Sequence, residues 1–202
     1  MPQSFLGNWC PLGGAVKRAR RAAFVLATMV AVWTPPAAPQ DGPALYEAKA
    51  KFLSVMPGFV EWPASTFKTP TSPLQICVHP DFSFGTSLAE LARTETVGGH
   101  RMEVKWARKE QDLAGCQLLF VSRSAAKRYG EVLEAVKNSV TLTVGEDPEF
   151  LKAGGMVSLQ AGQSGLLFDV NLNAVHDSHL KLSSQMLSLA RHIVQRPASA
   201  RS

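Results

Sequence analysis

The sequence predicts a three-layer α/β sandwich on a mostly parallel, Rossmann-like or flavodoxin-like sheet, with a C-terminal antiparallel hairpin and a long final helix. Two observations predict it. Strand-like and helical segments alternate through the middle of the chain, and the hydrophobic period then changes from two residues to three or four. Strands that alternate with helices are typical of βαβ units, whose strands lie parallel. At 202 residues, the chain suits one globular domain.

The alternating elements can be assigned one by one. The expected strand 117–122 has a continuously apolar centre, 118–121, which is typical of a strand buried on both faces. Asp147 followed by Pro148 is a favoured helix start, a cap and then a proline. The other expected strands are 74–78, 102–106 and 140–144, and the other expected helices are 43–56, 85–92 and 125–136.

The C-terminal part combines both periods. Residues 156–161 and 166–172 alternate in polarity and are separated by a short Gly/Ser/Gln segment, which predicts a β-hairpin. After it, one helical stripe predicts a helix over 180–194, with Asn171 or Asn173 placed to cap its approach. The stripe consists of Leu182, Met186, Leu189, Ala190 and Ile193.

Residues 1–44 are predicted to be a signal peptide and leader. A basic segment precedes an apolar run from Ala22 to Trp33, and prolines follow. That run is shorter than the roughly 20 residues of a membrane span, so a secretory signal is the better interpretation. We expect the processed chain to begin between Pro39 and Leu45, to form one domain over residues 45–196, and to end in a flexible tail at 197–202.

Charge excludes one class of partner. After Ala44 the chain holds 17 Lys and Arg against 15 Asp and Glu, which leaves a formal charge of about +2. Such a balance gives no electrostatic footprint for nucleic acid.

The cysteines agree with export. Cys10 leaves with the leader, whereas Cys77 and Cys116 stay, an even count in an oxidising compartment. They could form a disulfide or pack as two buried free thiols.

No catalytic constellation is recognisable. The sequence has no G-x-S-x-G elbow, no Walker loop and no G-x-G-x-x-G after its first expected strand. His176, Asp177 and His179 place two imidazoles near a carboxylate, but no third ligand follows at a metal-site spacing. We therefore expect no catalytic residue, no metal and no cofactor, and a protein that is not an enzyme.

The segment FVEWP has two interpretations. Phe59 and Trp62 could pack in the core, or they could form an exposed aromatic anchor for a protein partner, where Trp is over-represented. Glu61 lies between them and is expected to point outward or to pair with a cation.

Three segments together carry a family resemblance: KAKFLSVMPGFVEWP, LTVGEDPEFLKAGGMVSL and FDVNLNAVHDSHLKLSSQMLSLAR. In this order and spacing the chain resembles the YfiR family of bacterial periplasmic regulators, over roughly residues 46–195. The resemblance implies a structural disulfide between Cys77 and Cys116. Some relatives have a second, closely spaced cysteine pair, and this sequence has no cysteine there.

The resemblance also implies a function. YfiR-like proteins reside in the periplasm and bind the periplasmic part of an inner-membrane diguanylate cyclase, which represses it and lowers cyclic di-GMP and biofilm formation. The implied candidates for partner contact are Phe59, Glu61, Trp62, Lys181 and Ser184. An outer-membrane or periplasmic sequestering protein and a homodimer are further partners that this resemblance leaves open.

A second hypothesis is a periplasmic small-molecule sensor. In open α/β sheets, ligands bind beyond the carboxyl ends of the strands. That rule places a cleft near His79-Pro80-Asp81 and Ser122-Arg123. A purely structural envelope protein is the third alternative.

Overall fold

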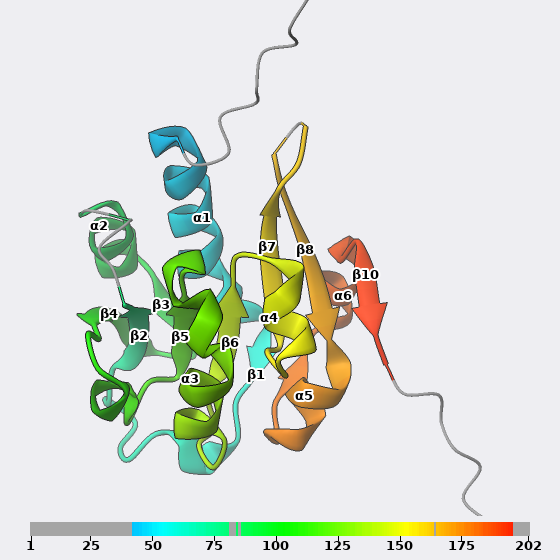
Figure 1. Ribbon diagram of the computed structural model, residues 1–202. Coiled ribbons are helices and arrows are strands. Elements are labelled where there is room, and N and C mark those ends of the chain that lie inside the picture. Colours follow the sequence, from blue (N-terminus) through cyan, green and yellow to red (C-terminus); the bar gives the residue numbers. More distant parts are fainter. Residues whose placement is uncertain (1–41, 81–83, 85, 164, 196–202) are drawn as a thin grey trace, which may run out of the picture. The chain divides into compact units, whose positions relative to one another are not determined.

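The computed structural model describes residues 42–80, 84, 86–163 and 165–195, which belong to one compact unit (Figure 1). The predicted leader up to residue 41 and the predicted tail lie outside the described residues. Among the residues that are described, no helix is both long and apolar enough to cross a membrane.

The elements follow in chain order. The strands are β1 (Val60–Glu61), β2 (Leu74–His79), β3 (Thr96–Val97), β4 (His100–Trp106), β5 (Leu118–Val121), β6 (Leu142–Gly145), β7 (Val157–Ala161), β8 (Leu166–Asn171), β9 (Lys181–Leu182) and β10 (His192–Val194). The α-helices are α1 (Pro43–Val55), α2 (Ser87–Thr94), α3 (Tyr129–Val136), α4 (Pro148–Lys152), α5 (Leu172–Asp177) and α6 (Ser184–Leu189). The 3₁₀ turns are η1 (Met56–Phe59), η2 (Ala64–Thr66), η3 (Glu110–Leu113) and η4 (Arg123–Arg128).

The main sheet confirms the predicted fold class. Its strand order is β10-β8-β7-β6-β5-β2-β4-β3. The five strands from β4 to β7 are all parallel, and in chain order they read 2-1-3-4-5, which is the flavodoxin-like arrangement. The order reverses between β2 and β5. β8 then returns antiparallel to β7, as the hairpin prediction requires.

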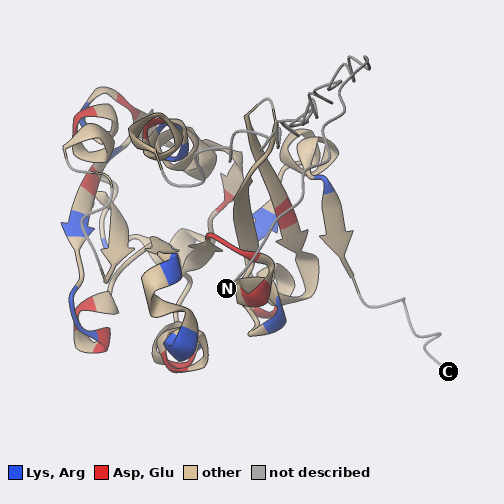
Figure 2. Cartoon of the chain, turned by 45° about the horizontal axis from the view of Figure 1, so that its top comes forward, with Lys and Arg blue, Asp and Glu red and all other residues tan. Residues whose placement is uncertain are grey.

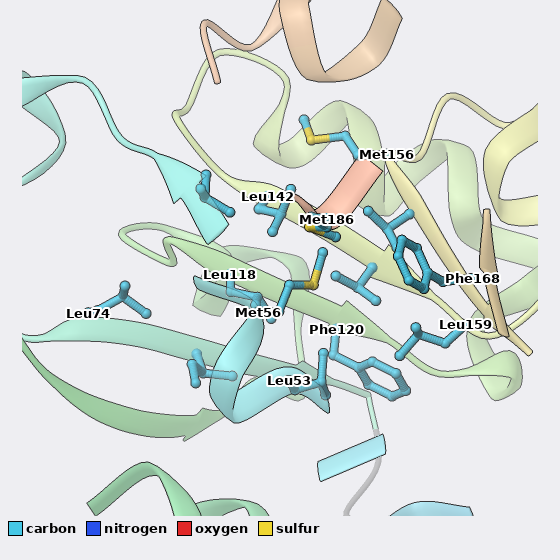
Figure 3. Close-up of a cluster of buried hydrophobic side chains, with 14 of the residues drawn as sticks. Leu53, Met56, Leu74, Leu118, Phe120, Leu142, Met156, Leu159, Phe168 and Met186 are labelled. Carbon is cyan, nitrogen blue, oxygen red and sulfur yellow. The ribbon is translucent and has the colours of Figure 1, made fainter. Parts of the chain in front are cut away.

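Two apolar layers sandwich this sheet. Along β2, Ile76 and Val78 belong to one core cluster, whereas Cys77 between them belongs to the other, because side chains alternate across a strand. The first cluster receives α1, α2, α5 and α6, and the second receives α3 and α4. Figure 3 shows Leu53 from α1 beside Phe120 of the sheet in the first cluster. Helices therefore cover both faces, giving the three layers.

The disulfide implied by the resemblance is present. Cys77 in β2 and Cys116 just before β5 are joined, with Cα atoms 5.8 Å apart and a sequence separation of 39. Both cysteines are buried within the second core cluster. The bond therefore links the two strands at which the strand order reverses.

The prediction of a long final helix over 180–194 is wrong in its length. α6 spans only Ser184–Leu189, and Ala190 is extended, with φ −67° and ψ 134°. The chain then runs parallel to β8 as β10. Arg191 donates its backbone N–H to the carbonyl of Phe168 at 2.9 Å, and its guanidinium pairs with Asp169. This tertiary pairing overrides the helical period.

β10 covers β8, so the hairpin does not form the edge of the main sheet. The predicted cap of the final helix also changes. Asn171 caps the short helix α5 by accepting a hydrogen bond from Ala174 N at 3.3 Å. The final helix α6 is capped instead by Ser183, whose Oγ accepts from Met186 N at 3.2 Å. Short side-chain caps of this kind satisfy backbone N–H groups that a helix start leaves unpaired.

Candidate functional site

The residues predicted for partner contact meet on a separate two-stranded ribbon. β1 pairs antiparallel with β9, and Glu61 lies opposite Lys181. We call residues 59–62 and 181–184 the β1–β9 ribbon. All five predicted contact residues belong to it, although they come from two distant segments of the chain. The structure therefore brings together on one ribbon what the sequence could only name separately.

Hydrogen bonds hold the ribbon against its surroundings. Ser183 donates its backbone N–H to the carbonyl of Phe59 at 2.8 Å, extending the pairing of β1 and β9 by one step. The same serine caps α6, whose first residue is Ser184. One residue thus fixes the end of the ribbon and the start of the helix that follows it.

The ribbon carries an exposed ion pair. Lys181 Nζ lies 3.6 Å from Glu61 Oε2, and the two side chains are 75% and 71% exposed. The expectation that Glu61 points outward or pairs with a cation is met in both respects. Exposed pairs of this kind contribute about 0–1 kcal/mol to stability. Both charges are therefore accessible to a partner at little cost to the fold.

The core interpretation of the aromatic residues holds in part, and their role as a partner anchor stays a prediction. Phe59 and Trp62 pack against the first core cluster, yet each is only half-buried. The indole Nε1–H of Trp62 donates to the carbonyl of Pro57 at 3.2 Å. The ring is therefore held in a fixed orientation while part of it stays in contact with solvent.

A hollow of about 570 Å³ lies beside this tryptophan. Trp62 forms part of its wall, and Phe67 and His100 form another part, their rings stacked with centroids 3.7 Å apart. Lys68 lies on the lining as well. Concave sites with aromatic walls suit apolar side chains. The hollow could take a side chain from a segment that docks on the ribbon.

The carboxyl ends of the strands, where the sequence placed a ligand cleft, are occupied by internal contacts. The buried ring of His79 has Nδ1 2.9 Å from the carbonyl oxygen of Ala107. Ser122 is buried too, with its Oγ 2.6 Å from that of Ser124. Asp81 lies outside the described residues. His79 Nε2, however, is buried without a hydrogen-bond partner among the described residues, and it lies 4.0 Å from Glu110 Oε1.

A buried ion pair at this end was not anticipated. Lys49 of α1 pairs with Glu146, which directly follows β6, and each side chain is 3% exposed. The other carboxylate oxygen of Glu146 accepts the backbone N–H of Arg123 at 2.6 Å. Buried charges require such pairing. The two residues are 97 positions apart, so no sequence pattern joins them.

The residues of the motif GEDPEFLKAGG have structural roles. Asp147 Oδ1 accepts the backbone N–H of Phe150 at 3.1 Å and caps α4, and its Oδ2 accepts the hydroxyl of Tyr129 at 3.0 Å. Burial raises the pKa of Tyr129, and the hydrogen bond to Asp147 raises it further, so the phenol stays neutral. A Cβ on Gly145 or Gly155 would lie 2.2 Å from the Phe150 ring. The glycines therefore allow this close packing.

The weak metal candidate is dispersed. His176 lies on α5, and His179 follows it with a left-handed φ of 58°; both side chains are exposed. Within the described part of the chain, no group of three His, Cys, Asp or Glu side chains could hold a metal ion. Basic and acidic residues are interspersed over the described elements (Figure 2).

The fold and the ribbon together define a disulfide-linked, flavodoxin-like α/β domain with an exposed candidate binding surface. The chain belongs to the YfiR/HmsC-like family, whose model matches residues 46–191. This family is regulatory rather than catalytic, and membership supports a role in cyclic di-GMP signalling. No curated protein matches the chain.

Two solved structures are similar at low sequence identity. One is a conserved domain protein from Vibrio cholerae O1 biovar El Tor str. N16961, with a TM-score of 0.50, 11% identity and coverage of 74% of this chain and 60% of that chain. The other is the ABC domain in complex with L-Trp from Streptococcus pneumonia, with a TM-score of 0.49, 9% identity and the same coverages. The chain thus spans 60% of the length of each. The first likeness supports the fold alone.

Proposed function

We propose that this protein acts in the periplasm as a non-catalytic repressor of an inner-membrane diguanylate cyclase, lowering cyclic di-GMP and biofilm formation. The β1–β9 ribbon binds the periplasmic part of the cyclase. The observation that carries the proposal is the convergence of Phe59, Glu61, Trp62, Lys181 and Ser184 on this ribbon. Family membership supplies the signalling context.

The physical logic is a population shift. A binding protein silences an enzyme across a membrane only if it binds the inactive conformation more tightly than the active one. Moving an equilibrium from 1:99 to 99:1 requires about 5.5 kcal/mol of differential affinity. A few central anchor residues can supply that energy, and Trp is enriched among them. Trp62 is the anchor, and Glu61 with Lys181 sets the orientation of the partner.

The relief of repression fits the same surface. An outer-membrane or periplasmic protein that covers the ribbon would sequester this protein from the cyclase, because one surface cannot serve two partners at once. A homodimer through another surface would present two ribbons and raise the avidity for a dimeric cyclase.

Cyclic di-GMP measurements in cells test the proposal. Deleting the gene should raise cyclic di-GMP where the cyclase is expressed, and restoring the wild-type gene should lower it again. Complementation with Trp62→Ala should restore little repression. Since Trp62 is half-buried, the variant must keep its thermal stability for the result to count.

A charge reversal gives the same test without touching the core. Glu61→Lys, at a side chain 71% exposed, should also lose repression. The matched control is Glu149→Lys, which breaks another exposed pair, Glu149–Lys152 on α4. It should repress normally. Unchanged cyclic di-GMP in the deletion strain would contradict the proposed function.

A further inference from the structure

A second hollow, of about 610 Å³, lies at the amino-terminal ends of β6 and β7, opposite the end where open α/β sheets usually bind ligands. Its walls come from the end of α3, the start of β6, the turn between α4 and β7, and α5. A volume of several hundred Å³ is within the range of small-molecule sites.

Two buried threonines, Thr141 and Thr143, line the hollow, and they differ in the use of their hydroxyl hydrogens. Thr141 donates to the carbonyl of Cys116 at 2.6 Å. Thr143 is 2% exposed and lines the hollow. Its Oγ1 accepts the backbone N–H of Met156 at 3.1 Å, but its own hydroxyl hydrogen has no acceptor among the residues that the structure describes. A buried donor without an acceptor is destabilising. An oxygen atom of a bound molecule would satisfy it.

A further donor lies on the same lining. Asn171 uses its Oδ1 to cap α5, which leaves its Nδ2 hydrogens without a hydrogen-bond acceptor on any described residue. Asn138, two residues beyond the end of α3, lines the hollow with an exposed side chain. Amides and hydroxyls present both donors and acceptors without a net charge.

The charged groups at this hollow do not select a charged ligand. Lys137 pairs with Glu134 at 3.3 Å, and both side chains are exposed at 64% and 71%. Asp177, the third charged residue of the lining, is exposed as well and has an interaction partner of its own. The buried part of the lining is neutral, with Thr143 beside the apolar surfaces of Met156 and Val136. A buried, unpaired ligand charge would be costly there.

We propose that this hollow binds a small, neutral, polyhydroxylated molecule of the monosaccharide or cyclic polyol class. One ligand oxygen accepts from Thr143 and another from Asn171, while the C–H face of the ring lies on Met156. The site is close in sequence to the proposed partner surface, because Ser178 lines the hollow and Lys181 of the β1–β9 ribbon follows it by three residues. This binding is independent of the cyclase.

Chemical-shift mapping on the purified, isotope-labelled protein tests the proposal. D-glucose, N-acetyl-D-glucosamine and myo-inositol are titrated separately, with D-gluconate as a charged probe of similar size. At least one neutral probe should give saturable shifts at the amides of residues 141–143, 154–156 and 171–178, and gluconate should give none there.

Three variants assign the binding to the hollow. Thr143→Ser keeps the hydroxyl and should bind within about twofold of wild type, whereas Thr143→Val removes it and should bind about 3- to 10-fold more weakly. Ala174→Leu fills the hollow from α5 and should abolish the shifts, which keeps the test valid if Thr143→Val does not fold. Absence of saturable shifts with every neutral probe, shifts that map elsewhere, or binding unaffected by Ala174→Leu would overturn the proposal.

Discussion

Lys49 and Glu146 join α1 to the end of β6 with side chains 3% exposed, whereas Lys181 and Glu61 join β9 to β1 with side chains 75% and 71% exposed. The two pairs have the same chemistry and opposite surroundings. A buried charge that loses its partner is costly, but an exposed pair contributes little to folding. The difference separates a pair that holds the fold from a pair that is available to another molecule.

Removing one buried charge should have the largest effect. Glu146→Gln leaves the Lys49 ammonium buried without a counter-charge, while its amide oxygen can still accept from Arg123 N. We expect the free energy of unfolding to fall by about 3–5 kcal/mol, measured by urea denaturation. The double variant Lys49→Met/Glu146→Leu should recover most of that loss. A decrease below about 1 kcal/mol for Glu146→Gln would mean that the pair does not hold α1 to the sheet.

The disulfide is the second buried link in this comparison. Cys77 and Cys116 close a loop over a sequence separation of 39. In the chain-entropy model, opening it should lower the free energy of unfolding by about 3–4 kcal/mol. Urea denaturation with and without a reductant measures the loss, and alkylation with peptide mapping confirms the redox state. Two freely alkylated cysteines in the native protein from the periplasm would contradict the assignment.

The sequence carried enough information for the sheet but not for its C-terminal edge. Parallel strands were predictable because β5 is uniformly apolar and Asp147-Pro148 marks a helix start, both local signals. The final helix was mispredicted because a salt bridge from Arg191 to Asp169 decides the local conformation. Asp169 lies 22 residues before Arg191, and a contact over this separation produces no periodic pattern in the sequence.

The candidate site also has features that the sequence predicts and features that it does not. Glu61 and Trp62 could be named because their types are unusual where they stand, and Lys181 because it lies within a family motif. Three other features depend on topology and could not be predicted from local sequence. They are the meeting of these residues on one ribbon, the Lys49–Glu146 pair and the hollow lined by Thr143. General fold rules placed a cleft at the carboxyl ends of the strands, where His79 Nδ1 and Ser122 Oγ instead contact other groups of the protein.

Asp169 offers an intermediate case, a buried carboxylate that pairs with the partly exposed guanidinium of Arg191. Burial alone would raise the pKa of Asp169, but hydrogen bonds from Arg191, His192 and Gln160 outweigh it and hold the pKa below its ordinary value. A depressed folded-state pKa gives stability that is present above the unfolded value, near 3.9, and lost as the pH falls through the folded value.

Asp169→Asn should therefore destabilise the protein by about 2 kcal/mol at neutral pH, and the difference from wild type should shrink below about pH 4. Urea denaturation of both proteins across this pH range measures it. Gln160→Ala, which removes a single neutral donor, is the milder control. A difference that stays constant through acid pH would show that the carboxylate charge is not what holds β10 to β8.

The smallest effect on stability is expected at the exposed pair. Glu61→Gln or Lys181→Met should change the free energy of unfolding by less than about 0.5 kcal/mol. Thermal unfolding of each variant beside wild type checks this. A loss as large as that of Glu146→Gln would place the ribbon pair among the groups that hold the fold and would remove the basis of the comparison.

The most direct test is the dissociation constant between this protein and the purified periplasmic domain of the cyclase, by titration calorimetry. Glu61→Lys should weaken binding by at least about tenfold, because it reverses a charge on the ribbon, and Glu149→Lys should bind within about twofold of wild type. Equal affinities of all three proteins, or an equal loss in both variants, would contradict the assignment of the β1–β9 ribbon as the partner surface.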